Sequence, residues 1–364
     1  MSDLILTWFA ADLRTGVIQA ELPAFTTSGP IGRRLGASVT AQGGFAPSGA
    51  PVGWRDATVP GRSMMVAVDT AAWQPVWAGM TMTRATGSAN AVPMGLLTPE
   101  GYLDRRYTGN YTTAVATDQA TILTGTGTAL TVNAPCFVLD APASGLTLDG
   151  YTVADGDDKT ILSVWTEIMA AEGGVEWTVD VAWANAAQTA FQLPIRIRPQ
   201  IGNVNPNPAT VFDYPGAVID YTQTESYEAG KGATTVKAVG NGQGTTRLQS
   251  DTLVDAALIA NGSPDWVYRF SPATGLDDPV QLDLHAAQAL AQMGPGSSVW
   301  TIVADANQAP HVGIDWGLGD SIGLLVETSL GHPDGASVSA RAYGWDLDTS
   351  GTTPTVSPIL IEGS

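Results

Sequence analysis

The amino-acid sequence predicts a mainly β protein with α+β insertions. Short strand-like apolar runs recur along the chain, and glycine- and proline-rich stretches separate them. In residues 175–183 apolar and polar side chains alternate without a break, which is typical of a strand with one buried face. Helical periodicity is confined to residues 157–172 and 280–293, so helices are expected only as insertions between strands.

The first hundred residues are predicted to be all β. An apolar run over residues 5–11, a turn over residues 12–16 and a second run over residues 17–22 predict an opening hairpin. Further strands are expected at residues 64–69 and 76–83, and glycine- and proline-rich stretches separate these runs from one another.

The helix predicted over residues 157–172 has the clearest signal in the chain. Asp157 or Asp158 is expected to cap its first turn, and Gly173 and Gly174 are expected to end it. Four apolar residues share one face of this helix: Ile161, Trp165, Ile168 and Met169. We expect this face to pack on the strand that follows.

A proline- and asparagine-rich passage over residues 202–216 is predicted to separate two halves of the chain. Strand-like runs follow it at residues 217–226, 234–239, 299–304, 322–327, 337–345 and 355–361. The helix over residues 280–293 carries an apolar stripe made of Leu282, Ala286, Ala289, Leu290 and Met293. A turn around residues 349–351 is expected to join the last two strands as a hairpin.

The charge balance argues against a nucleic-acid reader. The chain has 35 acidic and 16 basic residues and a formal net charge of −19 at pH 7, so phosphate backbones should be repelled. Cys136 is the single cysteine, which excludes an intramolecular disulfide, and its thiol is expected to be buried. Neither a signal peptide nor an apolar run of roughly 18 residues is found, so synthesis in a cytoplasm is expected.

The histidines suit neither catalysis nor metal binding. His285 lies on a predicted helix without a second ligand at metal-binding spacing, and His311 and His332 lie in predicted turns. The GDSI motif at residues 319–322 matches the nucleophile block of an esterase family, but Ser329 stands where that family has an aspartate, three positions before the histidine. A turn in which an aspartate bonds local backbone is therefore the preferred interpretation of the motif.

Two further motifs resemble ligand sites. Asp346, Asp348 and Ser350 follow the first half of a calcium loop, but Ser357 stands where that loop has a bidentate glutamate. A hairpin turn is preferred, and weak calcium binding at Asp346 and Asp348 is left open. The glycine-rich residues 240–244 are interpreted as a tight turn. The chain is accordingly predicted not to be an enzyme, with no catalytic, cofactor-binding or metal-ligating residue.

Six of the eleven tryptophans fall into two groups. Periodicity places Trp165, Trp177 and Trp183 in the core. Three others lie in loop-like surroundings and are candidate interface or ligand aromatics: Trp54, Trp266 and Trp316.

Several segments, taken in their order along the chain, carry a family resemblance. In the first half they are WFAADLRTGVIQAELP, GRRLG, GYLDRRYTGNY and TILSVWTEIMAAEGGVEWTVDVAW. In the second half they are DYTQTESYEAGKGATTVKAVGNGQG, AAQALAQM, WGLGDSIGLLVET and ARAYGWDLDTSGTTPTVSPILIEG. Together they cover most of the chain. Their order resembles that of the baseplate-hub or tail-hub (minor tail) proteins of actinobacterial siphoviruses.

The resemblance implies two antiparallel β-barrel domains of the tube type and two smaller helix-containing domains. The first barrel is expected over residues 1–104 and an α+β domain over residues 105–201. The second barrel is expected over residues 202–250 and 299–364, around an inserted helix-containing domain at residues 251–298. A homotrimer is also implied, in which three subunits with two barrels each form a ring of six.

The implied function is structural. The chain would close or extend the tail tube at the virion's tail tip and anchor other tail-tip proteins for host attachment and genome delivery. Its implied partners are the distal tail protein, the tape measure protein and other minor tail proteins; phage DNA only passes through the channel, and no cofactor is implied. A peripheral receptor- or glycan-binding adhesion protein and a cell-wall hydrolase are the alternatives, and a hexamer would indicate a distal tail protein.

Overall fold

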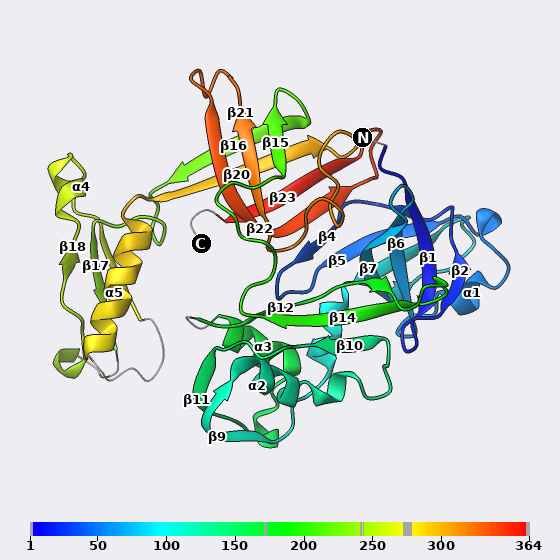
Figure 1. Ribbon diagram of the computed structural model, residues 1–364, viewed down its shortest axis with the longest axis horizontal. Coiled ribbons are helices and arrows are strands. Elements are labelled where there is room, and N and C mark those ends of the chain that lie inside the picture. The colour runs from blue at the N-terminus through cyan, green and yellow to red at the C-terminus, as the bar shows by residue number, and fades with distance from the viewer. Residues whose placement is uncertain (1–2, 171–172, 241, 243, 272–278, 362–364) are drawn as a thin grey trace. The chain divides into compact units, whose positions relative to one another are not determined.

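The computed structural model describes residues 3–170, 173–240, 242, 244–271 and 279–361 (Figure 1). Strands account for 43% and helices for 16% of it, which confirms the predicted mainly β fold class. Two compact units are present: Met1–Tyr221 together with Thr301–Ser364, and Thr222–Trp300. None of the described helices is long and apolar enough to cross a membrane.

The first large sheet has seven antiparallel strands in the order β2-β1-β6-β7-β8-β5-β3. Their bounds are β1 Leu6–Asp12, β2 Ile18–Glu21, β3 Thr26–Thr27, β5 Thr40–Phe45, β6 Ser63–Asp69, β7 Gln74–Arg84 and β8 Val92–Leu97. The antiparallel pairing of β1 with β2 confirms the predicted opening hairpin. Every residue of β6 is buried, because side chains on both faces of this central strand contact other parts of the fold.

The second large sheet has the strand order β15-β21-β22-β23-β20-β16, and β4 also pairs with β22. The bounds are β4 Ile31–Arg34, β15 Val211–Tyr214, β16 Val218–Ser226, β20 Ser297–Asp305, β21 Ser321–Val326, β22 Ala336–Asp348 and β23 Thr355–Ile361. The predicted hairpin of the last two strands is confirmed, and β15 pairs with β21 in parallel. Since β4 lies near the start of the sequence, the two ends of the chain build one sheet.

A smaller α+β part lies between the two large sheets in the sequence. Its strands are β9 Tyr111–Asp118, β10 Phe137–Asp140, β11 Thr147–Val153, β12 Glu176–Val179, β13 Ala182–Trp183 and β14 Phe191–Arg198. Strands β10, β14 and β12 form the small sheet, to which β13 adds, and β9 pairs with β11. Helices α2 (Gln119–Thr126) and α3 (Ile161–Met169) lie between the small sheet and the β9–β11 pair (Figure 1).

Helix α3 confirms the predicted helix but not its predicted cap. The hydroxyl oxygen of Thr160 accepts a hydrogen bond from the Ser163 amide at 3.2 Å, so Thr160 is the N-cap. The prediction of Asp157 or Asp158 is wrong because Asp155–Asp157 forms a separate 3-10 turn, η4. Ile161, Trp165 and Ile168 are buried as predicted, whereas Met169 is only partly buried and Val164 is buried in addition. Trp165 is in edge-to-face contact with Trp177 of β12.

The first large sheet and the small sheet share one apolar core. Phe9 of β1 lies 6.0 Å, ring centroid to ring centroid, from Phe191 of β14. Val175, Trp177 and Val179 are buried, as the alternation predicts. The predicted run does not continue as one strand with one buried face: β12 ends at Val179, Thr178 is buried too, and Val181 and Trp183 are only partly buried. Burial of these large apolar side chains fixes the α+β part against the first sheet.

The second compact unit has its own small core. Helix α5 (Pro279–Met293) packs on β17 (Thr235–Ala238), which lies between β18 (Leu253–Val254) and β19 (Val267–Phe270). The helix confirms the prediction for residues 280–293. The remaining short elements are η1 Pro47–Gly49, α1 Trp54–Ala57, η2 Pro99–Arg105, η3 Thr128–Leu130, η5 Gly244–Thr246 and α4 Ala256–Ala260. The turn predicted at residues 240–244 includes residues 241 and 243, which lie outside the described residues.

Candidate functional site

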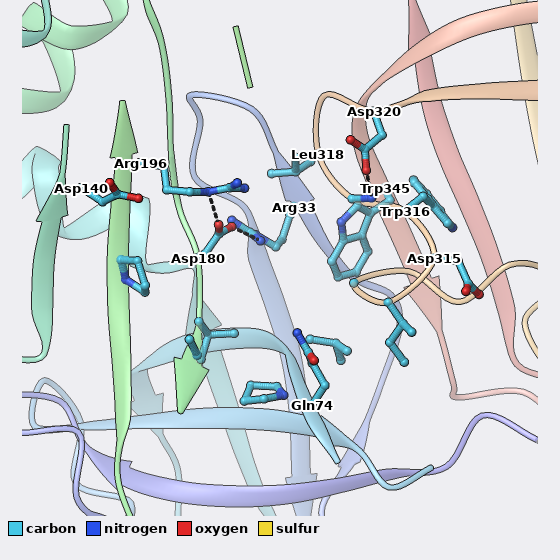
Figure 2. A pocket seen from close by; sticks show the side chains of 18 residues that line it. Arg33, Gln74, Asp140, Asp180, Arg196, Asp315, Trp316, Leu318, Asp320 and Trp345 are labelled. Atoms are coloured by element: carbon cyan, nitrogen blue, oxygen red, sulfur yellow. Dashed lines mark hydrogen bonds and ion pairs between the residues drawn. The ribbon is translucent and has the colours of Figure 1, made fainter. Parts of the chain in front are cut away.

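A cavity of about 510 Å³ opens in the first compact unit (Figure 2). Its walls come from β4, from the strands of the small sheet and from the loop between β20 and β21. Charged residues lie in each wall: Arg33, Asp140, Asp180, Arg196, Asp315 and Asp320. We call this space the Arg33 cavity; it brings together charged residues from distant parts of the sequence.

Asp180 lies between two arginines in the wall of the Arg33 cavity. Its Oδ1 lies 2.8 Å from Arg33 Nη1, and its Oδ2 lies 2.5 Å from Arg196 Nε (Figure 2). Arg33 also donates hydrogen bonds to Thr178 Oγ1 at 2.9 Å and to the Val179 carbonyl at 2.7 Å. Asp180 is therefore neutralised by two guanidinium groups and is a poor candidate for a proton acceptor or a cation ligand.

Glu100 is buried beside Arg33. Its side chain is 1% exposed, and its Oε1 lies 3.7 Å from Arg33 Nη2. Burial raises the pKa of Glu100 above its ordinary value, although the positive charge of Arg33 acts in the opposite direction. Burial alone would lower the pKa of Arg33, but the attraction of Asp180 and Glu100 holds it above its ordinary value. The three residues form one buried ion-pair network.

The other carboxylates of the Arg33 cavity also have partners within the chain. Asp140 forms an ion pair with Arg198 at 2.6 Å. Asp315 and Asp320 each accept a hydrogen bond of 2.7 Å from a backbone amide, which confirms the predicted backbone bonding of Asp320. Because each of these carboxylates is held by an arginine or by a backbone amide, the arrangement suits a rigid junction better than acid–base chemistry.

A second junction is formed by Arg341 of β22 and Glu176 of β12. Arg341 Nη1 lies 2.6 Å from Glu176 Oε1, and its Nη2 contacts Glu176 Oε2. The same guanidinium donates to the Gly319 carbonyl at 2.9 Å and to the Ile201 carbonyl at 2.6 Å, and it lies 4.9 Å from the centre of the Tyr343 ring. Burial would lower the pKa of Arg341, but Glu176 raises it. This residue ties the second large sheet to the small sheet.

A third contact links the first large sheet to the loop after β20. His311 Nδ1 lies 3.5 Å from Asp69 Oδ2, and both side chains are buried. Asp69 Oδ1 accepts hydrogen bonds from the amides of Ala71 and Ala72. The predicted turn context of His311 is confirmed, and the imidazole has an acidic neighbour that the sequence did not indicate.

The three candidate aromatics lie in different surroundings. Trp316 is buried in the wall of the Arg33 cavity, where its indole N–H donates to the Pro310 carbonyl at 3.0 Å. Trp54 begins helix α1 and does not line that cavity; the Arg55 guanidinium lies 4.7 Å from its ring centre. Trp266 belongs to the second compact unit and is 51% exposed. A role of these residues in an interface or in ligand binding stays a prediction.

In the described part of the chain, the serine of the GDSI motif is hydrogen-bonded to backbone and not to a histidine. The Ser321 hydroxyl oxygen accepts a hydrogen bond from the Asn205 amide at 3.0 Å. His332 instead lies 3.0 Å from the Tyr221 hydroxyl, measured from Nδ1. These hydrogen bonds fit the turn that was predicted from the sequence.

The calcium-like motif is a hairpin turn, as predicted. Both carboxylate oxygens of Asp346 accept hydrogen bonds from Arg34, at 3.0 and 2.9 Å. Asp348 Oδ1 accepts from the amide and the hydroxyl of Ser350, at 2.8 and 2.6 Å. Each of the two aspartates thus has a protein partner of its own, and calcium binding there stays untested.

The residues of the two buried junctions were not singled out from the sequence. Apolar and other residues alternate along β14 (FQLPIRIR), and Arg196 and Arg198 lie on its less buried face. This alternation is the sequence pattern from which a charged surface beside the small sheet could have been predicted. Nothing in the sequence pattern indicates that Arg33 or Arg341 would face that surface, because their partners are 147 and 165 positions away.

No protein-family model matches the chain, and no curated protein matches it in sequence. Solved structures do match its fold. The 43 kDa tail protein of prophage MuSo2 from Shewanella oneidensis has a TM-score of 0.61 at 8% identity, covering 98% of each chain. A tail protein from Neisseria meningitidis has a TM-score of 0.58 at 11% identity, covering 98% of this chain and 97% of that one.

The same fold occurs in a chain of a VgrG complex. A chain of the Francisella PdpA–VgrG complex has a TM-score of 0.56 at 8% identity, covering 98% of this chain and 57% of that one. At such low identities the likeness establishes the fold alone. The chain therefore has the fold of phage tail proteins, a fold that is shared with this VgrG complex.

Proposed function

We propose that the chain is a non-enzymatic structural tail protein of a bacteriophage and that it forms the hub at the tail tip. The observation that carries the proposal is the extent of the fold likeness: it covers 98% of this chain and nearly the whole of two phage tail proteins. An end-to-end match supports a common architecture more strongly than a match to one domain would, although a fold by itself does not determine function.

The buried junctions support a structural role. In the Arg33 cavity and around Arg341, the charged side chains bind one another or the backbone. Breaking such a buried network leaves unpaired charges, so the parts of the first unit resist relative movement. Rigidity of this kind suits a subunit that anchors other proteins.

The more specific part of the proposal follows the resemblance to hub proteins of actinobacterial siphoviruses. Three copies form a ring at the tail tip of the virion, with the distal tail protein, the tape measure protein and other minor tail proteins as neighbours. Phage DNA passes through the ring without being recognised, which agrees with the net charge of −19. No cofactor takes part.

Measuring the mass of the purified full-length chain in solution tests the proposal. We expect a trimer whose population grows with protein concentration. A stable hexamer would favour the distal tail ring, and a chain that stays monomeric up to high micromolar concentration would contradict a hub that assembles by itself.

A glycan-binding adhesion protein is the second candidate. Trp266 favours it, because this indole is 51% exposed and lies 6.1 Å, between ring centroids, from Tyr227. Paired aromatic faces can stack on sugar rings. A glycan array with the wild-type chain and Trp266→Ala tests this candidate; specific binding that disappears in the variant would favour it over the hub.

A further inference from the structure

A second cavity, of about 750 Å³, lies in the first compact unit beside the opening hairpin. The turn after β1 supplies Leu13 and Arg14, the residue before β6 is Arg62, and Tyr102 and Phe137 complete the wall. The rings of Tyr102 and Phe137 are stacked, with centroids 4.9 Å apart. We call this space the hairpin cavity. It combines two guanidinium groups with a partly apolar lining.

The guanidinium groups of the hairpin cavity have no partner in the described part of the chain. Arg14 and Arg62 are exposed, and neither side chain forms a hydrogen bond or ion pair there. The Leu13 amide donates to the Arg62 carbonyl at 2.8 Å, so the two arginines leave neighbouring points of the backbone. The carboxylate in the wall, Asp12, accepts hydrogen bonds from the Arg14 and Thr15 amides of its own turn.

The arginines that line the junctions between sheets differ from Arg14 and Arg62, because they have carboxylate partners. Five of them form ion pairs with carboxylates: Arg33, Arg34, Arg196, Arg198 and Arg341. An unpaired guanidinium presents a planar fork that matches a carboxylate in size and charge. The hairpin cavity therefore suits a protein segment that carries carboxylate side chains.

The chain itself contains such a segment at residues 155–158, which read Asp-Gly-Asp-Asp and are all exposed. Asp157 Oδ2 accepts a hydrogen bond from the Ala154 amide at 2.9 Å. The carboxylates of Asp155 and Asp158 form no hydrogen bond or ion pair with the described residues. Asp155, Asp157 and Asp158 thus place three carboxylates within four consecutive positions.

We propose that the hairpin cavity of one copy of the chain binds residues 155–158 of a neighbouring copy. The contact is head-to-tail, since the two surfaces differ, and contacts of this kind build closed rings when the rotation between copies permits it. The inference rests on the proposed self-association at the tail tip and names the surfaces that produce it. It also makes the association sensitive to salt, because both surfaces are charged and accessible before assembly.

Charge reversal in the full-length chain tests the contact. The cavity variant carries Arg14→Glu with Arg62→Glu, and the turn variant carries Asp155→Arg with Asp158→Arg. Each should weaken self-association by about tenfold or more, because like charges then face each other across the contact. A chain with all four substitutions should recover most of the loss, since the charges are again complementary. Mass photometry over a range of concentrations gives the association constants.

A matched control reverses two charges outside both surfaces, with Arg269→Glu and Asp334→Arg, which are also exposed. Its association should stay within about twofold of the wild type. The cavity variant and the control should keep the wild-type melting temperature within a few degrees, because their substituted side chains are exposed. The turn variant should lose slightly more, because Asp158 has a left-handed backbone conformation that aspartate tolerates better than arginine does. If the cavity and turn variants weakened association no more than this control, the inference would be overturned.

A labelled peptide of residues 152–160 separates this inference from the hub proposal. The wild-type chain should bind the peptide, and the cavity variant should bind it about tenfold more weakly. A peptide with asparagine at its three aspartates should bind as weakly. If rings form but the peptide does not bind and charge reversal has no effect, the proposed contact is rejected and the hub proposal stands. A monomeric chain that binds the peptide through Arg14 and Arg62 would reject the ring and support the cavity.

Discussion

Arg341 and Glu176 lie 165 positions apart in the sequence and form a two-point ion pair between β22 and β12. The arginine side chain is 3% exposed and the glutamate side chain 12% exposed. Both oxygens of the carboxylate are used, and the arginine also donates to two backbone carbonyls and to the Tyr343 hydroxyl. The pair therefore holds the second large sheet to the small sheet with little access of water.

Removing the arginine from this pair should be costly. Arg341→Met leaves Glu176 buried without its partner, so we expect the free energy of unfolding to fall by about 3 kcal/mol or more. As a control, Lys159→Met removes an exposed ion pair with Glu167 and should cost about 0.5 kcal/mol or less. Urea unfolding followed by tryptophan fluorescence measures both. Equal effects of the two substitutions would contradict a buried junction.

Glu100 should give the chain a pH dependence that runs against that of most carboxylates. Its pKa is raised by burial, so the native state holds this proton more tightly than the unfolded state does. The resulting stabilisation is complete below the ordinary pKa of glutamate and is lost as the pH rises through the raised value. Glu100→Gln should therefore gain stability relative to the wild type as the pH rises above the ordinary pKa of glutamate.

Urea midpoints of the wild type and Glu100→Gln, measured at matched pH values, check this prediction. Other groups titrate in the same pH range, but their contributions are the same in both proteins and cancel in the difference. If the difference in urea midpoint between the wild type and Glu100→Gln stayed constant from acid to neutral pH, burial would not control the ionisation of Glu100.

Asp118 should show the opposite dependence. Burial raises its pKa, but hydrogen bonds from Gly145, Ser144 and Thr121 lower it more, so the net direction is downward. The stabilisation that Asp118 contributes is present above the ordinary pKa of aspartate and is lost as the pH falls through the lowered pKa. Because Asp118 also caps α2, Asp118→Ala should cost about 1–2 kcal/mol at neutral pH. Thermal melts at neutral and acid pH should show the cost shrinking as the solution is acidified.

Cys136 should be unreactive in the folded chain. Its thiol is buried and donates to the Leu13 carbonyl at 2.7 Å, and burial raises its pKa to about 12. Thiolate is the reactive form, so labelling by a disulfide reagent at about pH 8 should be far slower than in urea. Rapid labelling of the native chain would contradict the buried position of this residue.

The sequence predicted those elements whose signal is local. The opening hairpin, α3 and α5 are each set by a periodicity within about twenty residues. The cap of α3 was predicted at Asp157 or Asp158 but lies at Thr160, because all three positions offer a side-chain oxygen near the helix start. Local patterns locate an element more reliably than its ends.

The candidate junctions could not be predicted in the same way. Strand β4 pairs with β22, so that Arg33 lies opposite Trp345, and this register depends on how distant strands meet. A run such as GRRLG shows that two arginines are adjacent, but not that Arg33 is buried against Asp180 and Glu100. Pairing between distant strands is decided by the packing of the whole sheet.

Cryo-electron microscopy of intact virions tests the central claim most directly, because it locates and counts the copies of this chain at the tail tip. The account predicts three copies in a ring around the channel below the tail tube. Six copies would place the chain in a distal tail ring, copies on the periphery would favour an adhesion protein, and absence from the particle would contradict the account.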